Sequence, residues 1–136
     1  MGPEKLATTA VAALEDVKGR DIVVFNVRKM TALFDKVIIV SGDSNRQVRA
    51  LANNVCVEVR KGGGRVLSTE GEQTGEWVLV DLGAVIVHVM QPAIRQYYNL
   101  EEIWGTEQRP KARKSVTSKS AGSKGAASRT SRRTAK

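Results

Sequence analysis

The chain has 136 residues, enough for one domain, and its 22 basic and 14 acidic residues give a net charge of +8. Residues 109–136 hold ten Lys or Arg and no Asp or Glu, which leaves 12 basic and 14 acidic residues in residues 1–108. One cysteine and one histidine exclude, within a single chain, an internal disulfide and a zinc site of Cys and His ligands. No apolar run reaches ~18 residues and no signal-peptide pattern is present, so we expect a cytosolic protein without a membrane partner.

The first third of the chain predicts a helix followed by two strands. Apolar residues at helical spacing, with Gly19 behind them, predict a helix over residues 4–17. Runs of β-branched residues predict strands over residues 22–27 and 36–40. Three apolar residues in the loop between these strands are expected to pack beneath the sheet, or else to form a contact surface: Met30, Leu33 and Phe34.

A turn and a second helix follow. Ser44 with Gln47 three residues later matches a capping box for a helix to Lys61, whose buried stripe is Val48, Leu51, Ala52, Val55 and Val59, with Cys56 at its edge. The turn at residues 41–44 could bind an anion through backbone N–H groups, but helix capping alone accounts for Ser44 and Gln47. A cysteine beside an apolar stripe is usually an inert small hydrophobe.

Residues 77–90 form two valine-rich runs that predict a hairpin, with Leu82 and Gly83 as its loop and Trp77 opposite His88. A short strand is expected before it at residues 65–68. Side chains alternate along a strand, so one face is a plain core face of Val78, Val80, Val85, Val87 and Val89. The other face mixes an aromatic, a histidine and a carboxylate: Trp77, Leu79, Asp81, Ala84, Ile86, His88 and Met90.

No arrangement of residues supports catalysis. His88 lies in a strand beside Trp77, which favours a packed or contact residue over a general base. Three glutamates in the loop at residues 69–76 predict a solvated surface in preference to a metal site: Glu70, Glu72 and Glu76. We expect no catalytic residue, no metal and no cofactor.

Pro92 opens a third predicted helix, and apolar residues from Leu100 to Trp104 predict a segment that closes over the body. The order αββαβββα predicts an α/β domain over residues 1–108, with a mixed five-stranded sheet and flanking helices. Residues 109–136 lack aromatics and are expected to be a disordered basic tail. Such a tail either contacts RNA phosphates, through residues such as Arg113, Lys114, Arg132 and Arg133, or serves only as a solubilising extension.

The body resembles the ribosomal silencing factor family, RsfS, also called the Iojap family. Four stretches carry the resemblance in order and at matching spacing: residues 21–24, residues 41–50 (Ser-Gly-Asp-Ser-Asn-Arg-Gln-Val-Arg-Ala), residues 70–92 with Glu-Trp-Val-Leu-Val-Asp-Leu-Gly at their centre, and residues 98–105 with Tyr98 and Trp104-Gly105. The loop sequence Phe34-Asp35-Lys36-Val37 and the residue Asn99 depart from the family pattern.

The resemblance implies a nucleotidyltransferase-like fold without transferase activity, and a homodimer. It also implies binding to the large ribosomal subunit through universal ribosomal protein fourteen, which blocks subunit joining and represses translation. The shared surface of the family maps onto the second hairpin face and the helix behind it, at Trp77, Leu79, Asp81, His88, Met90 and Tyr98. Two rivals stay open: a nucleotide-binding remnant at residues 41–44, and a general nucleic-acid binder that uses the tail.

Overall fold

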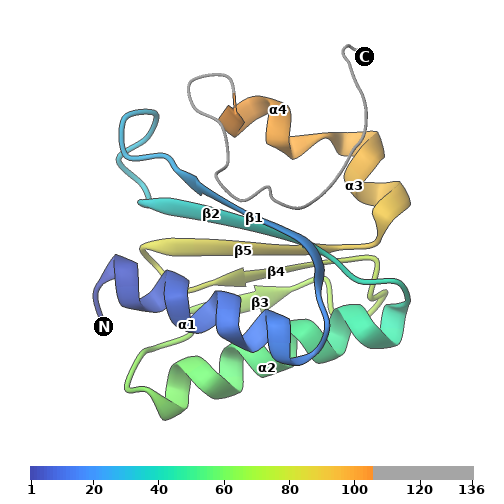
Figure 1. Cartoon of the computed structure of the whole chain (residues 1–136), viewed down its shortest axis with the longest axis horizontal. Coiled ribbons are helices and arrows are strands. Elements are labelled where there is room, and N and C mark those ends of the chain that lie inside the picture. The colour runs from blue at the N-terminus through green and yellow to red at the C-terminus, as the bar shows by residue number, and fades with distance from the viewer. Residues whose placement is uncertain (106–136) are drawn as a thin grey trace.

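The computed structural model describes residues 1–105, and places helices on both faces of one five-stranded sheet (Figure 1). Its elements in chain order are α1 (Pro3–Asp16), β1 (Arg20–Asn26), β2 (Lys36–Ser41), α2 (Asn45–Lys61), β3 (Ser68–Glu70), β4 (Trp77–Asp81), β5 (Val85–Met90), α3 (Pro92–Tyr98) and α4 (Leu100–Gly105). The segment predicted to close over the body is therefore a fourth helix.

The strands follow the order β1-β2-β5-β4-β3 across the sheet. β2 and β5 are parallel, and the other three neighbouring pairs are antiparallel. This confirms the predicted mixed sheet of five strands. Every residue of β2 is buried, as expected for a strand near the middle of a sheet with both faces covered.

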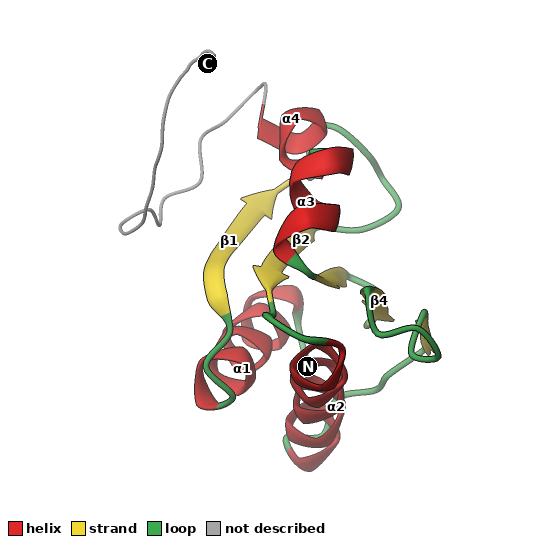
Figure 2. Cartoon of the chain, turned by 90° about the vertical axis from the view of Figure 1, so that its right-hand side faces the viewer, coloured by secondary structure: helices red, strands yellow, loops and turns green. Residues whose placement is uncertain are grey.

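One face of the sheet is covered by α1 and α2, which lie together on the same side (Figures 1 and 2). The predicted valine face points into this layer, and Val78, Val80, Val85, Val87 and Val89 are all 0% exposed. The helix α2 begins as predicted, because the Ser44 hydroxyl accepts a hydrogen bond from the Gln47 backbone N–H at 3.0 Å. Gly62 ends it.

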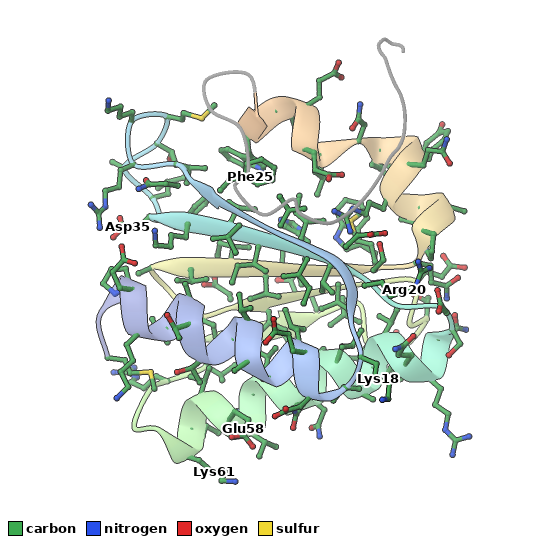
Figure 3. All side chains as sticks on the ribbon, in the orientation of Figure 1. Lys18, Arg20, Phe25, Asp35, Glu58 and Lys61 are labelled. Atoms are coloured by element: carbon green, nitrogen blue, oxygen red, sulfur yellow. The ribbon has the colours of Figure 1, made fainter. Side chains whose placement is uncertain are left out.

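The opposite face carries a smaller core beneath α3 and α4. Its buried residues come from β1, β2, the end of β5 and the residue after β1: Phe25, Val27, Val37, Ile39 and Met90. In Figure 3, Phe25 projects from β1 toward the α4 side. Met30 and Phe34 pack against this core as predicted, whereas Leu33 is 81% exposed.

The hairpin forms with a different register from the predicted one. Leu82 donates its backbone N–H to the Val85 carbonyl oxygen at 2.9 Å, so the loop is Gly83–Ala84 and not Leu82–Gly83. Trp77 consequently lies opposite Met90, and His88 lies opposite Leu79. Gly83 has a φ of 89°, which suits the first loop position of a type II′ turn. The register moves by two residues, and an even shift leaves the paired residues of both strands on their predicted faces. Ala84 is the exception, because it lies in the loop and packs against the valine-face core and not on the predicted Trp77 face.

The other differences concern strand ends. β3 spans Ser68–Glu70 instead of the predicted residues 65–68, because its pairing with β4 begins at Ser68 opposite Asp81. β1 begins two residues earlier than predicted. Its register shifts between Arg20 and Val23, where Asp21 has a φ of 54°, so the strand begins with an irregular turn that the apolar pattern did not show.

Candidate partner-binding face

The second hairpin face is only partly covered, because α3 and α4 pack over the β1–β2 half of the sheet. Five of the six predicted site residues remain at least partly exposed there: Trp77, Leu79, Asp81, His88 and Tyr98. They come from β4, β5 and the end of α3. We call these five residues the hairpin patch.

Trp77 is the centre of the hairpin patch. Its indole Nε1–H donates a hydrogen bond to His88 Nδ1 at 3.1 Å. Its ring centroid lies 4.9 Å from that of Tyr98, which in turn contacts Tyr97 edge-on at 5.0 Å. Tyr97 and Tyr98 are 81% and 52% exposed, so they extend the aromatic surface outward from Trp77. Rigid aromatic side chains held in this way supply contact area at a low cost in conformational entropy.

His88 is neutral near pH 7, because burial lowers its pKa to about 4. The bond from Trp77 requires Nδ1 to be unprotonated, so a proton on this nitrogen would break it. With Nδ1 occupied by the indole, His88 holds the orientation of Trp77. This agrees with the interpretation of His88 as a contact or packing residue.

Asp81 and Leu79 form the outer part of the hairpin patch on β4. Asp81 Oδ1 accepts a hydrogen bond from the Gly83 backbone N–H at 2.9 Å, so this carboxylate also fixes the hairpin turn. Leu79 is partly exposed opposite His88. The sixth predicted residue, Met90, is 0% exposed and belongs to the core beneath α3, against which Trp77 packs. Met90 was therefore wrongly predicted as part of an exposed contact surface.

A buried arginine that the sequence reasoning missed holds α3 and α4 on the sheet. The guanidinium of Arg95 makes two hydrogen bonds to the Glu101 carboxylate, at 3.1 and 2.9 Å, and a third to the Ser41 hydroxyl at 2.8 Å. Asn99, in the left-handed conformation with a φ of 48°, turns the chain between the two helices. We call Arg95 with Glu101 and Ser41 the clamp at Arg95. It fixes the position of α3, the helix that ends at Tyr98. An Arg–Glu spacing of six residues has no helical period, so only this turn brings the two together.

The turn at residues 41–44 uses its polar groups within the fold. The backbone N–H of Gly42 donates to the Met90 carbonyl oxygen at 3.0 Å, and that of Asp43 donates to Gln47 Oε1 at 2.7 Å. The Asp43 carboxylate is paired with the Arg20 guanidinium, whose hydrogen bond holds the pKa of this carboxyl below its usual range. These contacts agree with the helix-capping interpretation and leave two of the turn's N–H groups without capacity for an anion.

Several other sequence predictions can be located. Cys56 is buried, and burial raises the pKa of its thiol, as expected for an unreactive small hydrophobe. Within residues 1–105, no three His, Cys, Asp or Glu residues cluster as metal ligands would. None of the helices in this range is long and apolar enough to cross a membrane. The predicted RNA-binding residues of the tail, Arg113, Lys114, Arg132 and Arg133, lie outside the described residues.

These features define an α/β protein with a mixed sheet, a closed helical layer on one face and an aromatic patch on the other. The family model described as "Ribosomal silencing factor during starvation", RsfS, matches residues 2–136. The chain is 50% identical over 102 residues to the ribosomal silencing factor RsfS of Chromobacterium violaceum, covering 75% of this chain and 84% of that protein.

A crystal structure of a Chromobacterium violaceum protein superimposes with a TM-score of 0.76 at 50% identity, covering 77% of this chain and 88% of that one. A mouse protein named "Mitochondrial assembly of ribosomal large subunit protein 1" is 29% identical over 97 residues, covering 69% of this chain and 42% of that protein. The chain belongs to the RsfS family of ribosomal silencing factors. This confirms the family resemblance drawn from the sequence.

Proposed function

We propose that this protein is a non-enzymatic regulator that binds the large ribosomal subunit and represses translation by blocking its association with the small subunit. Family membership supports the general role of ribosome silencing. The name of the mouse relative supports the large subunit as the target. The partner implied by the family resemblance is universal ribosomal protein fourteen, and a cytoplasmic homodimer is part of the same proposal.

The observation that carries the proposal is the state of Trp77. This large aromatic is only partly buried, yet it is fixed by a hydrogen bond to His88 and by the ring of Tyr98. Tryptophan and tyrosine are the residue types that most often dominate the binding energy of protein interfaces. A fixed, partly exposed tryptophan with a polar rim at Asp81 therefore suits the docking of a folded protein.

Trp77→Ala tests this proposal by co-sedimentation with purified large subunits. We expect at least about tenfold weaker binding, which corresponds to about 1.4 kcal/mol or more. Val57→Ala is the matched control, because Val57 is 39% exposed on α2, in the helical layer of the other face. Thermal unfolding establishes that each variant is folded, and Tyr98→Ala, which removes a more exposed ring, repeats the test with less effect on the core. Unchanged co-sedimentation of folded Trp77→Ala and Tyr98→Ala would reject the hairpin patch as the docking surface.

The basic tail is proposed to contact ribosomal RNA and to raise the rate and salt sensitivity of association without choosing the target. Replacing Arg113, Lys114, Arg132 and Arg133 together with glutamine should lower the slope of log affinity against log salt by about 0.7–0.9 for each phosphate that is no longer neutralised. The preference for large over small subunits should remain. If that preference disappeared, the tail would be the element that reads the target.

A further inference from the structure

β1 is an edge strand, and its outer edge has no neighbour among the described helices and strands (Figure 2). The first part of this edge is distorted, because the register shifts between Arg20 and Val23. From Val23 to Asn26 the pairing with β2 is regular. Proteins usually cover or blunt such an edge, since its unpaired backbone groups accept another strand. The edge at Val24 is therefore a candidate site for an added strand.

The backbone direction along β1 follows from one hydrogen bond. Val27 donates its N–H to the Asp35 carbonyl oxygen, so Phe25 and Val23 also direct their N–H groups toward β2. The N–H of Val24 then points to the outer edge, where a further strand would pair. Val24 also lines a groove of about 380 Å³ beside this edge.

The groove lies between α1 and β1. Its apolar lining is Ala7, Val11, Ala12 and Val24. Its polar lining is Thr8, Lys36 and two glutamates toward opposite ends of α1, Glu4 and Glu15. Glu4 contacts Lys36 and Arg28, at 3.3 and 4.0 Å. Glu15 has no ion-pair partner within residues 1–105, so the groove has uncompensated negative charge at that end. A strand added outside β1 would direct alternate side chains into this groove.

We propose that the outer edge of β1 and its groove bind the basic segment Lys111–Lys119 of the same chain. This stretch contains Ser115-Val116-Thr117-Ser118, with the only large apolar residue of the tail, between Lys114 and Lys119. Five extended residues span about 16 Å, which equals the rise of about 16 Å along α1 between Glu4 and Glu15. A lysine ammonium on its four-carbon stem can reach a rim carboxylate from either side of the added strand.

The position at which the described chain ends supports this occupant. Trp104 in α4 packs edge-on against Phe34 at 5.8 Å and contacts the core that contains Phe25 of β1. Lys114 follows Gly105 by nine residues, and a stretch of that length can extend over as much as ~30 Å. The segment is thus within reach of the edge and competes with other ligands at a high effective concentration. The same positive charges are withheld from RNA while the segment is bound.

This proposal concerns the β1 edge of the sheet and does not depend on the ribosome-binding proposal. The test measures hydrogen exchange of the Val24 amide in the full chain, at low salt of about 50 mM where charge attraction is strong. Val116→Pro removes a strand donor from the segment, and Ala126→Pro is the matched control further along the tail. We expect Val116→Pro to accelerate exchange at Val24 by about tenfold or more and Ala126→Pro to leave it unchanged.

A second pair of variants tests the charge of the groove. Glu15→Lys should accelerate exchange at Val24, whereas Glu70→Lys, the same change on the edge strand β3, should not. Equal exchange rates in Val116→Pro and the parent chain would overturn the proposal. Protection at Val24 that falls on dilution of the parent chain would also overturn it, because the edge would then bind a second copy.

Discussion

The two faces of the sheet are covered to different extents, although they are built from the same strands. On the α1–α2 face, β4 and β5 present only valines, and all five are 0% exposed. On the other face the same strands present Trp77, Leu79, Asp81 and His88, which remain partly exposed beside α3. The first face supplies most of the core, so residues on the second can be selected for contact with a partner at little cost in stability.

The clamp at Arg95 sets the boundary between the covered and the open half of the second face, so its loss should have the largest effect. Arg95→Ala leaves Glu101 and Ser41 without their shared partner. The Arg95 side chain is buried but that of Glu101 is 34% exposed, so loss of these charge-assisted hydrogen bonds should lower the free energy of unfolding by about 2–3 kcal/mol. Urea unfolding measures the change, with Glu102→Ala on the exposed side of α4 as the control within about 0.5 kcal/mol of the parent. A change below about 1 kcal/mol for Arg95→Ala would show that α3 and α4 are held by apolar packing instead.

His88 predicts a pH dependence that the valine face lacks. In the unfolded chain its pKa is 6.5, and in the folded protein burial lowers it to about 4. Between these two pKa values the unfolded state binds more protons than the folded state. The contribution of His88 to the free energy of unfolding is therefore fully present above pH 6.5 and is lost as the pH falls toward 4, by up to about 3 kcal/mol. Denaturant unfolding at several pH values, compared with His88→Gln, isolates this contribution from that of the carboxylates. If the free energy of unfolding changed equally with pH in the parent chain and in His88→Gln, the pKa of His88 would not be lowered by folding.

Substitutions at Val80 and Leu79, neighbours in β4 that point to opposite faces, compare the contributions of the two faces to stability. Val80→Ala removes two methyl groups from a fully buried position and should lower the free energy of unfolding by about 2 kcal/mol. Leu79→Ala removes a larger group from a partly exposed position and should cost less than about 1 kcal/mol, while it weakens binding to large subunits. Unfolding and co-sedimentation of both variants give the comparison. Equal losses of stability would mean that the second face is as much a core face as the first.

Much of this arrangement could be predicted from the sequence because apolar alternation depends only on strand geometry. The valine face, the capped helix α2 and the central strand β2 all followed from residue patterns and are confirmed. The hairpin register could not be derived, because Leu82–Gly83 and Gly83–Ala84 both place Gly83 within a two-residue loop. The observed choice places Gly83 at the position that needs a positive φ and lets Asp81 bind its N–H.

The sequence predicted which residues share the face of the candidate site, but not which of them are exposed. Alternation put Met90 on the same face as Trp77, but only tertiary packing shows that α3 buries Met90 and leaves Trp77 partly exposed. Arg95 escaped the sequence reasoning because its partners Ser41 and Glu101 come from β2 and α4, at separations that follow no helical or strand period.

Site-specific photo-cross-linking tests the claim that the open half of the second face docks on the large subunit. A photoreactive p-benzoylphenylalanine replaces Tyr98, which is 52% exposed beside Trp77, or Val57, on α2 over the closed face. With purified large subunits, we predict that the label at position 98 forms an adduct with one ribosomal protein and that the label at position 57 forms none. Adducts only from position 57, or none from position 98 in a sample that co-sediments with the subunit, would contradict the account.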